Sequence, residues 1–136
     1  MVARGYSQIL LLEFMENYSP VVHDITFCLL LIAKMIYELS AKIVNAETSL
    51  LYGDLDKEIF MNSPEGLPLA TDQDALKLQK CIHGLVQATR QYDMKMVDML
   101  KHIGFKEHAL NPCLYMKRDE NGLIYVALYV DDNLLI

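Results

Sequence analysis

The spacing of apolar residues predicts two helices. Between residues 88 and 103 they recur every three or four positions, which is typical of an amphipathic helix. Lys101 in its last turn and Gly104 just beyond are common at the end of a helix. An earlier segment, Asp24 to about Leu39, is apolar on nearly all sides, with Asp24 as its N-cap. Because so little of it is polar, this second helix is expected to be buried.

Short β-prone runs separated by turn residues predict the strands. The expected elements are strands at Lys42–Val44, Glu58–Met61 and Leu123–Val130, one turn of helix at Thr48–Tyr52, a turn at Asp131–Asn133 and the start of a returning strand at Leu134–Ile136. Residues 62–74 carry two prolines and a glycine among polar residues and form the longest predicted loop, the expected mobile region.

This order of elements predicts the α+β fold class, with helices packed on an antiparallel sheet. We expect a single domain, or part of one, over residues 1–136, because no linker or repeat divides the chain. The returning strand at the C-terminus would leave an unpaired apolar edge, a hazard that natural domains avoid. We therefore expect a chain truncated after its last hairpin.

The composition of the chain limits the cellular compartments and the binding partners that we expect for it. The formal net charge of −6 argues against a protein that binds nucleic acid through a general basic surface. Three widely spaced cysteines suggest neither a disulfide framework nor a metal knuckle, which fits an intracellular compartment. The longest apolar stretch, Ile25–Ala33, is well short of the roughly 20 residues of a membrane span. Hence we expect a protein that is neither secreted nor bound to a membrane.

Two adjacent carboxylates, Asp131 and Asp132, follow the most apolar predicted strand. Hard oxygen ligands on a rigid turn are suited to holding the paired Mg²⁺ ions of phosphoryl-transfer enzymes. A solvated hairpin turn explains the same residues equally simply, since Asp and Asn tolerate turn dihedrals. Their spacing alone leaves both alternatives open.

A series of short blocks along the chain shifts the balance towards the metal-site reading. Tyr129–Asp132 reads YVDD, and the earlier blocks are Val2–Gln8, Tyr18–Val22, Leu51–Leu55, Glu58–Met61 with Pro64–Gly66, His83–Leu85 with Gln87–Gln91, Gly104–Phe105 and Pro112–Tyr115. In this order they resemble the copia-type LTR-retrotransposon reverse transcriptases. The resemblance covers nearly all 136 residues.

The resemblance implies a reverse-transcriptase fingers and palm region that ends after the YVDD hairpin, without a thumb. Such enzymes add deoxynucleotides to a primer 3′-hydroxyl, using palm aspartates that bind two Mg²⁺ ions. Asp131 and Asp132 would then be catalytic metal ligands, and Tyr129, Arg4 and Gln87 would contact substrate. Its implied partners are an RNA or DNA primer-template and a deoxynucleoside triphosphate.

Three positions around the expected metal site depart from the family pattern. Asn45 stands where the third metal-binding aspartate is expected, and it keeps the size but loses the charge. Leu50 replaces the aromatic residue that rejects a ribose 2′-hydroxyl, and Glu47 replaces a common lysine. Leu50 could equally be ordinary core and Glu47 a solvated surface charge. Together these changes predict impaired Mg²⁺ binding and a severe loss of catalysis.

Three functional hypotheses follow from the sequence. The chain could be a polymerase fragment by descent that is now inactive, or a non-catalytic binding or structural protein that the host has kept. It could also be the product of a decayed element with no retained role. A cooperative thermal melt and a metal-independent partner would distinguish the second from the others.

Overall fold

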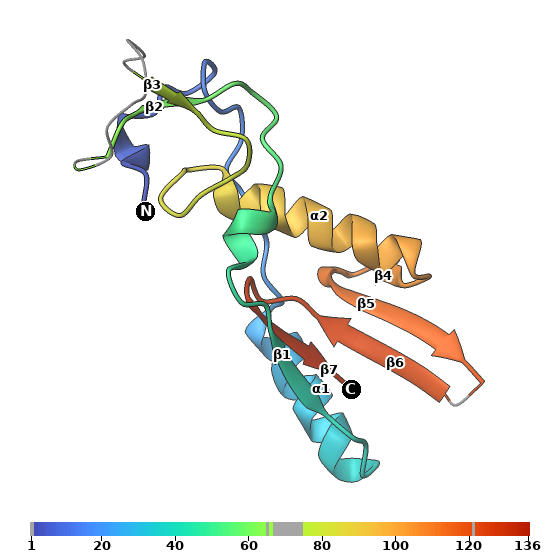
Figure 1. The fold of residues 1–136 in the computed structure, drawn as a ribbon. Helices are drawn as coiled ribbons and strands as arrows, with labels where there is room; N and C mark the ends of the chain where they lie inside the picture. The colour runs from blue at the N-terminus through green and yellow to red at the C-terminus, as the bar shows by residue number, and fades with distance from the viewer. Residues whose placement is uncertain (1, 65, 67–74, 121) are drawn as a thin grey trace. The chain divides into compact units, whose positions relative to one another are not determined.

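Helices and antiparallel sheets make up the chain in the computed structural model (Figure 1), so the α+β prediction is confirmed. The structure describes residues 2–64, 66, 75–120 and 122–136. They divide into two compact units. Unit 1 runs up to Ser19 and then from Thr48 to Lys95, and unit 2 comprises Pro20–Glu47 and Met96–Ile136.

Unit 2 is built on a five-stranded antiparallel sheet in the order β1-β7-β6-β5-β4. The strands are β1 (Lys42–Asn45), β4 (Lys106–His108), β5 (Asn111–Asp119), β6 (Gly122–Ala127) and β7 (Asp132–Leu135). The expectation of an unpaired C-terminal edge is wrong, because β7 lies between β1 and β6 and bonds to both. That edge is therefore no argument for a truncated chain.

Helix α1 (Asp24–Ile36) confirms the predicted helix but not its details. His23 is the N-cap residue, without a side-chain cap, and Asp24 is the first helical residue. The expected burial is wrong, since no residue of α1 is buried. Only one side packs, where Phe27 and Leu30 contact the unit 2 core. None of the helices in the described residues has the length and hydropathy needed to cross a bilayer.

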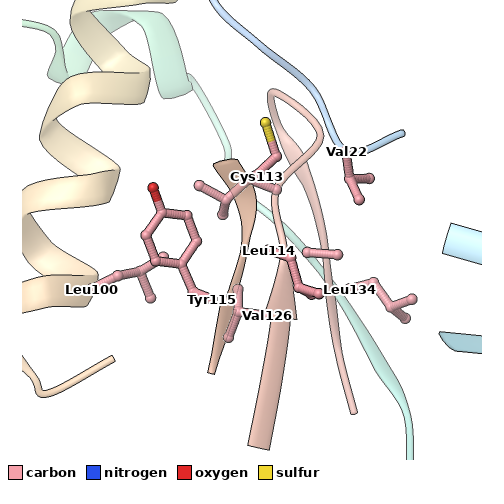
Figure 2. Close-up of a cluster of buried hydrophobic side chains, with 9 residues drawn as sticks. Val22, Leu100, Cys113, Leu114, Tyr115, Val126 and Leu134 are labelled. Atoms are coloured by element: carbon pink, nitrogen blue, oxygen red, sulfur yellow. The ribbon is translucent and has the colours of Figure 1, made fainter. Parts of the chain in front are cut away.

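The core of unit 2 includes buried side chains on both faces of the sheet (Figure 2), because successive residues of a strand point to opposite faces. Leu114 and Tyr115 of β5 are paired with Ala127 and Val126 of β6, and all four are buried. Leu134 of β7 is paired with Ala127 and continues the layer of Leu114 and Ala127. Val22, Leu100, Cys113 and Leu128 complete the buried cluster. The strands that carry the YVDD motif are therefore anchored by the same core as the rest of the sheet.

Helix α2 (Ala88–His102) agrees with the segment predicted from periodicity. It ends as expected at Gly104, whose φ of +92° lies in the left-handed region that glycine favours. The Gly104 and Phe105 amides donate to the carbonyls of Lys101 and Leu100, at 3.1 and 2.9 Å. These bonds use carbonyls that the helix end would otherwise leave unpaired.

Unit 1 has little regular structure. It contains two 3-10 turns and a two-stranded sheet: Gly5–Ser7, Ser49–Tyr52, β2 (Phe60–Asn62) and β3 (Ala75–Lys77). The turn at Ser49–Tyr52 and strand β2 were predicted from the sequence, whereas the turn at Gly5–Ser7 and strand β3 were not. Most of the predicted 62–74 loop lies outside the described residues. The buried core of unit 1 consists of Ile59, Cys81, Leu85 and Ala88.

A close backbone approach fixes the N-terminal segment within unit 1. The Ala3 amide donates to the His83 carbonyl at 2.7 Å. Gly84, with φ of +93°, lies so close that an added Cβ would stand 2.1 Å from the Ala3 carbonyl oxygen. Only glycine fits at position 84 without a backbone shift, and this explains why the His83–Leu85 block contains a glycine.

Two leucines of the unit 2 sheet test the assigned core. Leu134→Ala is expected to lower the free energy of unfolding by about 2–4 kcal/mol, because it empties a buried site. Leu123→Ala in β6, where the side chain is exposed, should cost less than about 1 kcal/mol. Urea denaturation of both variants measures the difference, and equal losses would contradict this packing.

Candidate functional site

The predicted metal residues meet where β1 pairs with β7. Asn45 lies opposite Asp132 in the register of the two strands. Its amide Nδ2 donates to the Asp132 Oδ1 at 2.8 Å. One position further, the Ala46 amide donates to the Asp131 carbonyl at 2.9 Å. Strand pairing thus brings together residues that are 87 positions apart in the sequence.

The YVDD residues form a tight turn between β6 and β7. The Asp132 amide donates to the Tyr129 carbonyl at 3.0 Å, which closes the turn. Val130 has a φ of +49°. A β-branched residue in this left-handed region is strained, and such strain gathers at functional sites where the surroundings enforce it. Here the flanking strands hold the turn, because both β6 and β7 are paired on each side.

The two carboxylates differ in their surroundings. Asp132 is exposed, whereas Asp131 is half-buried. The next residue, Asn133, is buried, and its Nδ2 donates to the Asp131 carbonyl at 3.5 Å. Asn133 Oδ1 is one of the buried side-chain atoms without a hydrogen-bond partner in the described part of the chain. A buried unpaired acceptor typically costs about 1–3 kcal/mol, so the start of β7 carries a desolvation cost in addition to the strain at Val130.

A small apolar cavity of about 280 Å³ borders the turn within unit 2. It is lined by Val22, Asp24, Phe27, Ile43, Tyr129, Asp132, Asn133 and Leu134. Of these residues, only Tyr129 and Asp132 were predicted from the sequence to belong to a site, and no cavity was predicted. Only the three-dimensional packing of α1 and β1 next to β7 creates it.

The donor set does not fit a two-ion Mg²⁺ centre. Such a centre takes oxygen ligands, and carboxylates supply most of its negative charge. Asn45 instead directs an N–H group at Asp132, so that one carboxylate oxygen already accepts a hydrogen bond. No group of three His, Cys, Asp or Glu side chains that could hold a metal ion occurs in the described residues.

The other predicted substrate residues, Arg4, Leu50 and Gln87, belong to unit 1, whereas Tyr129 and the aspartates belong to unit 2. Arg4 is exposed and lines a cavity of about 750 Å³ with Gly5, Ser7 and the β2 segment. Leu50 packs against the buried core of unit 1, as its alternative reading expects. Their contact with substrate stays a prediction.

Gln87 is buried and fully engaged inside unit 1. Its Oε1 accepts a hydrogen bond from Gln8 Nε2 at 3.1 Å. Its Nε2 donates to the Glu13 carbonyl at 3.3 Å. Gln8 in turn accepts from the Val86 amide at 2.8 Å. In this structure the Gln87 side chain ties the N-terminal segment to the start of α2, a role that the sequence did not indicate.

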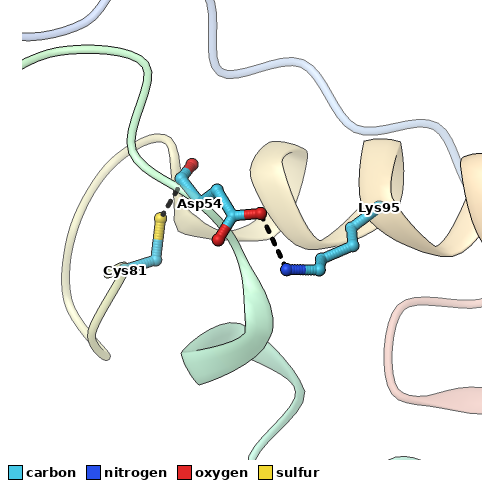
Figure 3. A network of polar contacts seen from close by, with 3 residues as sticks. All are labelled: Asp54, Cys81 and Lys95. Atoms are coloured by element: carbon cyan, nitrogen blue, oxygen red, sulfur yellow. Dashed lines mark hydrogen bonds and ion pairs between the residues drawn. The ribbon is translucent and has the colours of Figure 1, made fainter. Parts of the chain in front are cut away.

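Asp54, in the Leu51–Leu55 block, anchors a polar network in unit 1 (Figure 3). Lys95 Nζ donates to the Asp54 Oδ2 at 2.7 Å, and this bond holds the pKa of the exposed carboxyl below its usual value. The Cys81 thiol donates weakly to the Asp54 carbonyl. Burial raises the pKa of that thiol from 9.0 to about 11, which keeps it neutral and unreactive at pH 7.

The pKa shift of Cys81 also links stability to pH. The folded-state pKa is above the unfolded value, so the thiol supports folding fully below pH 9.0. Between pH 9.0 and about 11 the unfolded chain loses this proton first, and the contribution disappears. The network therefore has a structural role, with no sign of a reactive cysteine.

A pair of substitutions tests the strain at the YVDD turn. Val130→Gly is expected to be more stable than Val130→Ala by about 1 kcal/mol, because glycine adopts a positive φ without penalty. At an ordinary position the order is reversed. Both variants lose the valine side chain, so chemical denaturation of the two isolates the backbone effect. A more stable alanine variant would show that Val130 is not left-handed in solution.

Comparison with known proteins supports the interpretation of the motifs. All of residues 1–136 match the family described as reverse transcriptase (RNA-dependent DNA polymerase). The retrovirus-related Pol polyprotein from transposon TNT 1-94 of Nicotiana tabacum is 36% identical over 100% of this chain. That from transposon RE2 of Arabidopsis thaliana is 28% identical over 99% of it.

The chain spans 10% of the tobacco protein and 9% of the Arabidopsis protein. A putative transposon Ty5-1 protein of Saccharomyces cerevisiae is 31% identical over 68% of this chain. No solved structure matches. The resemblance stated from the sequence blocks is thus confirmed, and the chain belongs to the reverse transcriptases of copia-type retrotransposon Pol polyproteins.

Proposed function

We propose that this chain is the fingers and palm part of a copia-type reverse transcriptase whose metal site no longer supports polymerisation. Unit 2, with its antiparallel sheet and the YVDD turn, would be the palm, and unit 1 the fingers. The observation that carries the proposal is the hydrogen bond from Asn45 Nδ2 to the Asp132 Oδ1. The side chain at this position, which in the family would coordinate a cation, here donates a hydrogen bond to a carboxylate of the same site.

The missing negative charge explains why asparagine in place of aspartate at position 45 would weaken the site. Family polymerases bind two divalent cations next to a triphosphate, and each carboxylate offsets part of that positive charge. With Asn45 in place of an aspartate, the site has two carboxylates where the family has three. An amide also lacks the charge that holds Mg²⁺ against its strong hydration. Weak occupancy of the site and negligible nucleotide transfer are the expected results.

The surroundings of Asn45 add to this effect. Glu47 is exposed two residues beyond Asn45, which agrees with its reading as a solvated surface charge. Near an incoming triphosphate it would repel substrate rather than attract it. The net charge of −6 offers little general attraction for a primer-template. Both partners implied by the family would therefore bind weakly here.

Restoring the carboxylate tests the proposal. Asn45→Asp is expected to tighten Mn²⁺ binding by about tenfold or more, because it supplies a third oxygen anion. Electron paramagnetic resonance of free Mn²⁺ measures this for the full chain. Asn17→Asp is the matched control, since it adds the same charge at an exposed position of unit 1. It should leave Mn²⁺ binding unchanged.

Primer extension on an RNA template, with Mg²⁺ or Mn²⁺, gives the second readout. The wild-type chain should incorporate no nucleotide above the level of an Asp131→Asn/Asp132→Asn variant. Metal-dependent incorporation by the wild type would show that Asn45 is tolerated. Equal Mn²⁺ affinity of the wild type and the Asn45→Asp variant would show that the loss lies elsewhere.

A further inference from the structure

The sheet of unit 2 supplies one wall of the small cavity beside the YVDD turn. Ile43 of β1 and Leu134 of β7 are partners in the strand register, so their side chains share one face of the sheet. Asp132 lies two residues before Leu134 in β7 and therefore on the same face. All three residues line this cavity of about 280 Å³. The wall is thus apolar, with a carboxylate beside it.

Helix α1 supplies a second wall of the same cavity. Asp24 and Phe27 are three residues apart, so their side chains lie on the same side of the helix. Both line the cavity, and Phe27 also packs against the core of unit 2. Tyr129, which is 49% exposed, adds a second aromatic ring. The cavity therefore combines apolar and aromatic walls with two carboxylates, Asp24 and Asp132, from separate elements.

The charges around the cavity are of one sign. No Lys, Arg or His is among the described residues that line it. Asp24 and Asp132 are exposed, and neither takes part in an ion pair within the described part of the chain. The hydrogen bond that Asp132 accepts from Asn45 comes from a neutral amide. Two carboxylates without a countercharge beside an apolar cavity favour a cation whose apolar part can fill that cavity.

We propose that this cavity binds a small organic cation, with an amidinium group next to Asp24 and Asp132 and an aromatic ring inside. A planar amidinium suits the site, because it can donate two parallel N–H bonds to a carboxylate. The rings of Phe27 and Tyr129 can contact both the ligand ring and its positive charge. Sites for small molecules usually measure about 300–1,000 Å³, so this one suits a ligand at the lower end of that range. The proposal depends on the geometry of unit 2 and not on the proposed function.

Benzamidine is the probe that tests this site, and benzamide is its neutral counterpart of nearly the same shape. Titration of each compound into the isotope-labelled full chain, followed by ¹H–¹⁵N NMR, gives the dissociation constant and the residues that respond. We expect saturable shifts with benzamidine around residues 22–27, 43 and 129–134, which surround the cavity. Benzamide should bind at least about tenfold more weakly, because it cannot form charge-assisted hydrogen bonds with the carboxylates.

Substitutions separate a specific site from general attraction by an acidic protein. Asp24→Asn removes one carboxylate and keeps the shape of the side chain, so it should weaken benzamidine binding by about three- to fivefold. Asp98→Asn is the matched control, because Asp98 is exposed on α2 and does not line the cavity. It should leave binding unchanged. Ile43→Trp, at an exposed position of the cavity wall, should block benzamidine binding.

Three results would overturn the proposal. Equal affinity for benzamidine and benzamide would show that the cavity does not select a cation. Equal effects of Asp24→Asn and Asp98→Asn would show only general attraction by the net charge of −6. Shifts that do not saturate, or that lie away from the cavity, would show that no ligand binds there. Because none of these titrations contains Mg²⁺ or nucleotide, their failure would leave the proposed function unaffected.

Discussion

The pairing of β1 with β7 is the constraint on which the candidate site depends. It places Asn45 opposite Asp132 and joins Ala46 to Asp131, so that two distant segments share one site. The same pairing makes β7 an internal strand and allows Leu134 to enter the core. A change in this register by one residue would turn every side chain of β7 to the opposite face. Core packing therefore fixes the position of the carboxylates.

The sheet around the YVDD turn is firmly held whether or not the site binds metal. The turn retains a strained Val130, held by strands that are paired on both sides. Strain of this kind is useful where a ligand has to be positioned, and it persists only when the surroundings enforce it. Asn45 is part of the paired β1 strand and forms a hydrogen bond with Asp132 across the pair. A well-ordered sheet is thus no sign, by itself, of an active site.

The sequence predicted those elements whose signals are local. The periodicity of α2 and its glycine end were sufficient, as were the β-prone runs of β1 and β2. Strand β4 was missed because its three residues are charged or polar, whereas β5 was missed although it contains the apolar run Cys113–Met116. The exposure of α1 and the internal place of β7 depend on long-range packing that no local pattern encodes. For the site, family blocks identified Asn45 and the aspartates, but not the bond between Asn45 and Asp132 or the buried role of Gln87.

In the structure the Asn45 side-chain amide donates a hydrogen bond to the Asp132 carboxylate. Carbon-detected NMR of the Asp131 and Asp132 carboxyl groups, recorded together with the Asn45 side-chain amide during a Mg²⁺ titration, tests whether this bond persists or Mg²⁺ replaces it. We expect the Asn45 amide signal to be shifted by its hydrogen bond, and the carboxyl signals to show no saturable change at millimolar Mg²⁺. Saturable shifts of both carboxyl groups, together with release of the Asn45 amide, would contradict it.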